Sequence, residues 1–211
     1  MVAAADDATV GVGPWPGGPA AWPDDPRYDP QLLADGDRRN VLDRYRYWTV
    51  EAIVADVDSH RHPLHVAIEN FAHDMNIGSV VRTANAFAVA EVHIVGRRRW
   101  NRRGAMVTDR YQHLRHHADV AGLLAWAHEA ELPVLGIDNV PGSVPIEGRA
   151  LPRAAVMVFG QESAGLSAEA LAGCTEVLHI RQYGSTRSIN AGAAAAVAMH
   201  AWMVQHAGPA A

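Results

Sequence analysis

Residues 178–202 read LHIRQYGSTRSINAGAAAAVAMHAW, and this stretch predicts a strand, a polar loop and a helix in direct succession. Residues 178–180 predict a short strand, whereas the alanine run from Ala191 onward has the highest intrinsic helix propensity. Ser188 is the expected N-cap, because its hydroxyl can accept a hydrogen bond from a backbone N–H group of the first turn. One helix face is predicted to carry Ile189, Ala193, Ala196, His200 and Met203. A strand, a polar loop and a capped helix in this order can direct backbone N–H groups at a ligand.

The segments before this stretch alternate between strand and helix patterns. Residues 64–71 and 92–96 are expected to be strands that flank a helix, with Asn76 as its candidate N-cap. A β-α-β unit of this length implies parallel strands. Further helices are expected at residues 120–131 and 167–171, and further strands at residues 133–139 and 154–160. We therefore predict an α/β fold with a mostly parallel sheet and helices on both faces.

The chain before residue 64 has a different character. Residues 1–37 are rich in Pro, Gly, Ala and Asp and show neither a helical nor a strand period, which predicts a mobile or loosely docked acidic arm. Residues 38–63 are predicted to be a lead-in helical segment, because apolar side chains recur there at helical spacing. Residues 64–211 are predicted to form the main domain.

The composition excludes several classes of protein. No apolar run approaches the roughly 20 residues that span a bilayer, so we expect no membrane partner. Cys174 is the only cysteine, which excludes an internal disulfide and a cysteine-cluster metal site and fits a reducing, cytoplasmic setting. His113, His116 and His117 have no cysteine nearby, and we expect them to face RNA or solvent rather than to bind a metal.

The net charge of −5 hides a separation of charge along the chain. Residues 1–37 hold seven aspartates and one arginine, whereas residues 97–117 hold seven arginines and one aspartate. A local basic patch is the relevant footprint for a polyanion, and arginines around an aromatic ring suit phosphate contact and base stacking. We therefore expect RNA contact from Arg97, Arg98, Arg99, Trp100, Arg102 and Arg103.

Three polar clusters each follow a predicted strand. The first holds Asn70, Asn76 and Arg82, the second is residues 159–165 (FGQESAG), and the third holds Ile180, Gly184, Ser188, Ile189 and Asn190. The carboxyl ends of parallel strands collect at one edge of a sheet, where ligands usually bind. The sequence thus predicts that Arg82, Glu162, Ser188 and Asn190 converge.

These clusters resemble the three motifs of the SpoU (TrmH) family of RNA ribose methyltransferases, within the SPOUT superfamily. The family's first motif, an asparagine, a glycine two residues on and an arginine, is matched by Asn76, Gly78 and Arg82. The second, Phe-Gly-x-Glu-x-x-Gly, is matched by Phe159, Gly160, Glu162 and Gly165. The third, Ile-Pro-Met-x-Gly and then Ser-Leu-Asn after three residues, is matched by Ile180, Gly184, Ser188, Ile189 and Asn190. Order and spacing agree over residues 64–206.

The resemblance implies a deep trefoil knot, in which the C-terminal segment threads through a loop and holds S-adenosylmethionine (AdoMet) in a bent shape. It implies AdoMet-dependent methyl transfer to a ribose 2′-hydroxyl of structured RNA by a homodimer, with tRNA slightly favoured over rRNA as the substrate. The residues that would line the AdoMet site are Gly160, Ile180, Gln182 and Ile189. Arg82 would act on the 2′-hydroxyl. The groups that would orient it and the RNA phosphate are Asn76, Glu162, Ser188 and Asn190.

Two questions stay open at this stage. Family accounts make the arginine at position 82 a general base, but a guanidinium with a pKa above about 12 stays protonated, so it could instead stabilise the forming alkoxide. The sequence also departs from the family pattern: Arg181-Gln182 replaces Pro-Met, Ala88 replaces a glycine and Ala191-Gly192 replaces Val-Ser. These changes leave two alternatives, a non-catalytic RNA-binding protein that retains the fold and a SPOUT enzyme that methylates a base.

Overall fold

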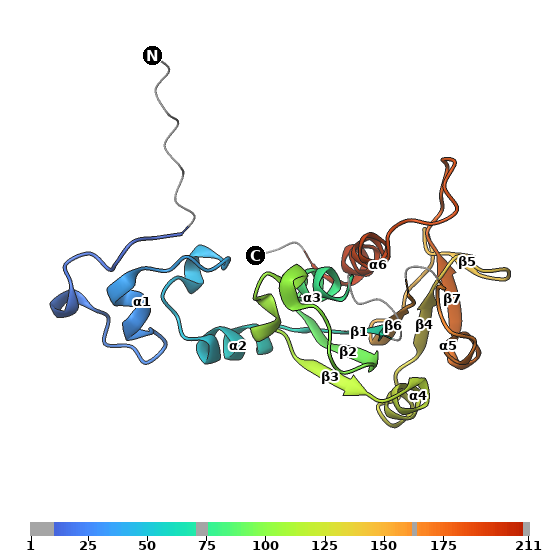
Figure 1. The fold of residues 1–211 in the computed structure, drawn as a ribbon, viewed down its shortest axis with the longest axis horizontal. Helices are drawn as coiled ribbons and strands as arrows, with labels where there is room; N and C mark the ends of the chain where they lie inside the picture. The colour runs from blue at the N-terminus through green and yellow to red at the C-terminus, as the bar shows by residue number, and fades with distance from the viewer. Residues whose placement is uncertain (1–10, 71–75, 162–163, 209–211) are drawn as a thin grey trace, which may run out of the picture. The chain divides into compact units, whose positions relative to one another are not determined.

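The protein is described by a computed structural model, which defines residues 11–70, 76–161 and 164–208 (Figure 1). The chain forms two compact units, residues 1–59 and residues 60–211. In the described residues no helix is both long and apolar enough to cross a membrane.

The second unit is built on a seven-stranded sheet in which every pairing is parallel. The strands are β1 (His62–Asn70), β2 (Val89–Gly96), β3 (Leu114–His117), β4 (Val134–Ile137), β5 (Val144–Pro145), β6 (Ala155–Phe159) and β7 (Glu176–His179). Their order across the sheet is β3-β2-β1-β6-β4-β7-β5. The helices of this unit are α3 (Ile77–Ala86), α4 (Val120–Glu129), α5 (Ala168–Gly173) and α6 (Ala191–His206).

Helices cover both faces of this sheet, as Figure 1 shows. On one face α3 and α6 bury apolar side chains against β1 and β6, with the fully buried Trp202 among them. On the other face α4 and α5 pack over a second apolar cluster that includes Val156 and Leu123. The predicted α/β fold, with a parallel sheet between two layers of helices, is therefore confirmed.

The start and the orientation of α6 differ from the prediction. Its N-cap is Asn190, whose Oδ1 accepts hydrogen bonds from the backbone N–H groups of Gly192 (2.9 Å) and Ala193 (3.2 Å), so the prediction of Ser188 as the cap is wrong. The buried face carries Gly192, Ala195, Ala198, Met199, Trp202 and Met203, whereas Ala193 and His200 are exposed. An alanine-rich helix has little amphipathic contrast, so sequence periodicity could not orient it.

Two further segments differ from the sequence prediction. The edge strand β3 is absent from the predicted elements, because its Leu-Arg-His-His sequence lacks the apolar signal of a strand. Of the helical segment predicted over residues 38–63, only the 3-10 turn η2 (Asp43–Tyr45) and α2 (Val50–Asp58) are helical. Thr49 caps α2, because its side chain accepts a hydrogen bond from the backbone N–H of Ala52 at 3.1 Å.

In the first unit, the described residues are packed together on both sides of residue 37, which was the predicted boundary between the acidic arm and the helical segment. It contains the 3-10 turn η1 (Pro19–Ala21) and α1 (Pro30–Asp35). The ring of Trp15 packs edge-on against Tyr28 and Tyr47, with centroids 5.7 Å and 5.3 Å apart. Asp37 is fully buried and accepts hydrogen bonds from the Arg39 guanidinium and from the Tyr47 backbone N–H. Aromatic packing and a buried ion pair thus hold together residues that composition alone assigned to a mobile arm.

Candidate functional site

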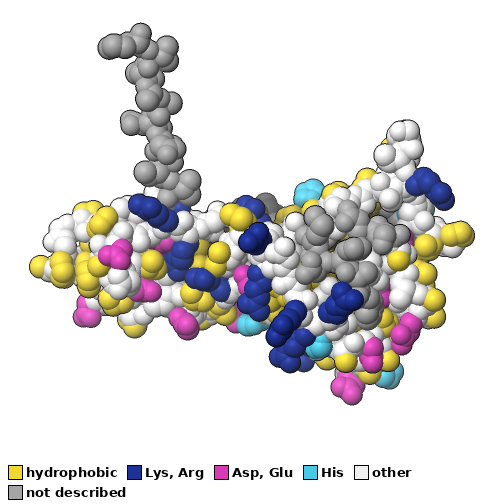
Figure 2. Space-filling view, in the orientation of Figure 1, with side chains coloured by type: hydrophobic (Ala, Val, Ile, Leu, Met, Phe, Trp, Pro, Cys, Tyr) yellow, Lys and Arg dark blue, Asp and Glu magenta, His cyan; other side chains and the backbone are white. Residues whose placement is uncertain are grey.

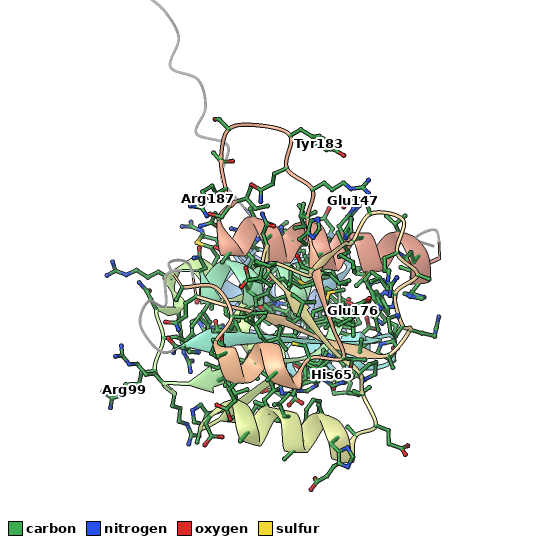
Figure 3. All side chains as sticks on the ribbon, turned by 90° about the vertical axis from the view of Figure 1, so that its right-hand side faces the viewer. His65, Arg99, Glu147, Glu176, Tyr183 and Arg187 are labelled. Atoms are coloured by element: carbon green, nitrogen blue, oxygen red, sulfur yellow. The ribbon has the colours of Figure 1, made fainter. Side chains whose placement is uncertain are left out.

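A cavity of about 420 Å³ lies at the carboxyl ends of β4, β6 and β7, beside the first turn of α6. The sequence-predicted cofactor residues line it together, namely Gly160, Ile180, Gln182 and Ile189. Ser188 lines it as well. The loop between β7 and α6 carries the exposed Tyr183 and Arg187 above α6 (Figure 3). The structure therefore gathers the second and third motifs around one hollow.

Two glycines that follow β6 have no room for a side chain. A Cβ at Gly160 would lie 2.0 Å from the carbonyl carbon of Gly165, and Gly165 itself has a φ of +68°. The backbones of Gln161 and Gly165 exchange two hydrogen bonds of 3.0 Å and 2.9 Å. Glycine tolerates positive φ and close approach of the backbone, so steric constraints explain why both motif positions are glycine.

Asp138 is a site residue that the sequence analysis missed. It follows β4 and lines the cavity, where its carboxylate accepts hydrogen bonds from the backbone N–H groups of Leu166 and Asn139, both at 2.7 Å. The Asn139 amide in turn donates to the carbonyl of Arg187 at 3.2 Å. Asp138 and Asn139 thus connect the second motif to the third. The sequence feature that could have identified Asp138 is the Asp-Asn pair directly after a predicted strand.

The first and third motifs meet through two asparagines. Asn190 Nδ2 donates to Asn76 Oδ1 at 2.9 Å across a separation of 114 residues. Asn76 stands at the N-cap position of α3, as predicted, but its side chain bonds to Asn190 instead of capping the helix. Gly192 lets the two helix ends approach, since a Cβ there would lie 3.2 Å from the Cβ of Ser79. The departure from the family's serine at this position therefore suits the close contact between α3 and α6.

Arg82 lies on α3, six residues after Asn76, and its side chain is exposed. No described residue pairs with its guanidinium, which leaves the charge available to a ligand. It does not line the cavity described above. Glu162, the predicted acidic member of the site, lies outside the described residues.

The basic segment is anchored beside α3. The Asn70 side chain donates to the backbone carbonyls of Arg97 (2.6 Å) and Arg99 (3.0 Å). A Cβ at Gly78 would lie 2.7 Å from the Cα of Gly104, so the motif glycine allows the 3-10 turn η3 (Arg102–Ala105) to pack on α3. Figure 2 shows arginine side chains gathered on this part of the surface, and Arg99 points outward in Figure 3.

Two residues of the basic region are less accessible than the sequence suggested. Trp100 packs partly buried against the core, with the Arg102 guanidinium 5.7 Å from its ring centroid. The arginines themselves are exposed. His117 is buried and bonded to His93, so the expectation that it faces RNA or solvent is wrong, whereas His113 and His116 are exposed.

Comparison with known proteins gives concordant matches. Residues 63–200 match the profile of the SpoU rRNA Methylase family. A protein of Mycolicibacterium vanbaalenii named an uncharacterized tRNA/rRNA methyltransferase is 30% identical over 194 residues, covering 82% of this chain. This chain spans only 58% of that relative's length.

Two more distant proteins match over a somewhat smaller share of the chain. The tRNA (guanosine(18)-2′-O)-methyltransferase of Escherichia coli K12 is 25% identical over 153 residues, 71% of this chain and 67% of that protein. The SpoU methyltransferase AviRb of Streptomyces viridochromogenes, solved in complex with AdoMet, matches with a TM-score of 0.63 at 20% identity, over 71% of this chain and 63% of AviRb. The likeness to AviRb concerns the fold alone.

Proposed function

The chain belongs to the SpoU rRNA methylase family, and on that premise we propose that it transfers a methyl group from AdoMet to a ribose 2′-hydroxyl of structured RNA. The observation that carries the proposal is the meeting of all three motifs at the carboxyl edge of the sheet. The Asn76–Asn190 hydrogen bond joins the first motif to the third, and one cavity joins the second to the third.

Several groups that line the cavity suit AdoMet. Gly160 and Gly165 both line it, and a Cβ at either position would collide with the Gly165 backbone or with the Asp138 carboxylate. The buried Gln182 Oε1 accepts no hydrogen bond from the described residues and could accept one from a donor of the ligand. Gly160, Ile180, Gln182 and Ile189 would hold the cofactor, which when bound supplies an electrophilic methyl group. AviRb, which shares this fold, was solved with AdoMet bound, and this supports the same choice of cofactor.

The chain's own residues would position and stabilise the 2′-hydroxyl. In-line positioning of the two reactants can contribute about 7–11 kcal/mol to catalysis. A guanidinium is a poor proton acceptor, so we assign Arg82 to stabilise the alkoxide as the proton leaves, rather than to remove that proton. Asn76, Asn190 and Ser188 would orient the ribose and its phosphate, and Glu162 would take part with them.

The exposed arginines of residues 97–103 would hold the phosphates of the RNA, with tRNA slightly favoured over rRNA. The names of both curated relatives support an RNA substrate. We also propose a homodimer formed through the second unit, since α6 exposes the apolar Val197 (44%) and Val204 (70%). The trefoil knot expected from the family resemblance belongs to the same proposal.

The test is methyl transfer from labelled AdoMet onto separate pools of unmodified tRNA and rRNA, followed by alkaline hydrolysis. A 2′-O-methyl group removes the nucleophile of strand cleavage, so label in an alkali-resistant dinucleotide is the expected result. Label released in mononucleotides would instead identify a base-methylating enzyme. No AdoMet binding at millimolar concentration would favour a non-catalytic RNA-binding protein.

A further inference from the structure

Three histidines form a continuous chain beneath α4, on the sheet face opposite α3 and α6. Each comes from one of three adjacent parallel strands: His65 from β1, His93 from β2 and His117 from β3. His65 Nδ1 lies 3.1 Å from His93 Nε2, and His93 Nδ1 lies 2.9 Å from His117 Nε2. Figure 3 shows His65 on this side of the sheet, away from α6. None of the three belongs to the motifs used above.

An acidic side chain adjoins the first two histidines. Glu91 stands two residues before His93 on the same strand and in register with His65 on the next, so all three share one face. Its Oε2 lies 3.7 Å from His93 Nε2. One ligand atom from each of His65, Glu91 and His93 lies within 4.8 Å of the others. Two imidazoles and a carboxylate are the donor set of a typical three-residue transition-metal site.

We propose that His65 Nδ1, His93 Nε2 and the Glu91 carboxylate bind one divalent first-row transition metal ion, with Zn²⁺ as the first candidate. At Zn–N distances of about 2.0–2.1 Å, two nitrogens of a tetrahedral site lie roughly 3.3 Å apart. The observed distance of 3.1 Å between the two nitrogens is close to that spacing. A water molecule would complete the tetrahedral shell.

Neighbouring side chains hold the three proposed ligands in place, as is usual around metal sites in proteins. With His93 Nε2 on the metal, its Nδ1–H donates to His117 Nε2 at 2.9 Å, which fixes the tautomer and the ring orientation. The ring of Trp126 lies 4.2 Å from that of His93 and covers the cluster. Arg115 donates to Glu91 Oε2 at 2.9 Å and holds the carboxylate in place. His117 and Arg115 are thus positioning residues in this proposal.

Access from solvent also fits a bound ion. His93 is fully buried, but His65 and Glu91 are only partly buried, so an ion can reach the site from solvent. The ion would clamp β1 to β2 on the face away from the methyl-transfer site.

The test uses the full chain, stripped with a chelator and titrated at pH 7.5 with Co²⁺ and, in competition, with Zn²⁺. One equivalent of Co²⁺ should bind and give the intense visible absorption of a four-coordinate ion. We expect His65→Gln and Glu91→Gln to weaken Zn²⁺ binding about 100-fold or more, and His117→Gln to weaken it about 10–100-fold. The matched control is His128→Gln, an exposed histidine on the same helix as Trp126, which should bind as the wild type does.

Absence of stoichiometric binding by the wild-type chain would overturn the proposal, and would assign the cluster to a chain of hydrogen-bonded neutral imidazoles. Equal Zn²⁺ affinity in wild type, His65→Gln and Glu91→Gln would overturn it as well. Circular dichroism of each variant checks its folding. The wild-type Co²⁺ spectrum decides the matter even where a variant fails to fold, and neither readout depends on methyl transfer.

Discussion

Two polar clusters on the same sheet are organised in opposite ways. At the carboxyl edge, Asn76 and Asn190 bond to each other, while Arg82 stands exposed with no described partner. Beneath α4, the nitrogens of His65, His93 and His117 that face one another are paired within the cluster, and His93 is fully buried. The first arrangement presents a charged group to solvent, whereas the second is mostly buried beneath α4. The two clusters therefore differ in exposure as well as in residue type.

The largest expected effect concerns Arg82. If this guanidinium stabilises the forming alkoxide, Arg82→Ala should lower the rate of methyl transfer about 10²–10³-fold and leave AdoMet affinity within about twofold. The measurement is single-turnover transfer together with calorimetric AdoMet binding. Arg153→Ala is the matched control, because Arg153 is exposed and precedes β6 at the opposite edge of the sheet. A similar loss of methyl-transfer rate in both variants would show that the carboxyl ends of the strands are not the special location of catalysis.

The second prediction concerns the exposed arginines beside the site. Replacing Arg97, Arg98, Arg99, Arg102 and Arg103 by serine should flatten the slope of log affinity against log salt by about 3.5–4.5, if each contacts one phosphate. Between 50 and 200 mM salt, wild-type affinity for RNA would then fall about 100- to 500-fold more than that of the variant. Filter binding across this range measures the slope. An unchanged slope would exclude this segment from the RNA interface.

The third prediction tests how well α4 and α5 shield the sheet face that they cover from solvent. Burial raises the pKa of the Cys174 thiol to about 11, compared with 9.0 for an unperturbed thiol. At pH 8 the native thiolate fraction should therefore be about 100-fold lower than in the unfolded chain, and alkylation correspondingly slower. Between pH 9 and 11 the thiol stays protonated in the folded state but ionises in the unfolded state. The contribution of Cys174 to the free energy of unfolding is therefore lost as the pH rises through that window. Equal alkylation rates in native and denatured protein would contradict this.

A smaller effect is expected from replacing Gly160, which directly follows β6. Gly160→Ala would place a Cβ against the Gly165 backbone and should destabilise the fold by about 1–3 kcal/mol, with weaker AdoMet binding. Gly184→Ala is the matched control in the loop above the same cavity, because a Cβ added at Gly184 would meet no other atom within 4 Å. Thermal unfolding with and without AdoMet compares the two. Equal behaviour would mean that the turn after β6 is not a rigid wall of the site.

The smallest effect is a gain in stability. Ala88 follows α3 with a φ of +47°, a conformation that suits the glycine usual in the family. Ala88→Gly should therefore stabilise the protein by about 0.5–1 kcal/mol without changing activity. Chemical denaturation measures the change, and a destabilised variant would show that the methyl group contributes packing that outweighs the backbone strain.

Much of the fold was predictable because strands and helices alternate with clear apolar patterns from residue 64 onward. The prediction failed where that pattern is weak. The sequence of β3 is polar, and α6 is so rich in alanine that its buried face could not be chosen. In residues 11–59, order depends on aromatic contacts and on the buried Asp37, which no periodicity records.

The site was predictable to the extent that its residues follow strands. Gly160, Ile180, Gln182 and Ile189 gather around one cavity because parallel strands bring their carboxyl ends together. Asp138 escaped notice because one acidic residue after a strand is a common turn feature. The burial of His117 escaped notice because exposure depends on what α4 covers.

The sequence by itself determined most of the alternating strands and helices and the three motifs that place the chain in its family, because these depend on residue type and spacing. The tertiary structure decided which of these residues touch. The bond between Asn76 and Asn190 spans 114 residues, and the histidine chain crosses three strands. Such contacts follow from strand register and helix orientation. These are set by the packing of the whole core, so no local pattern can encode them.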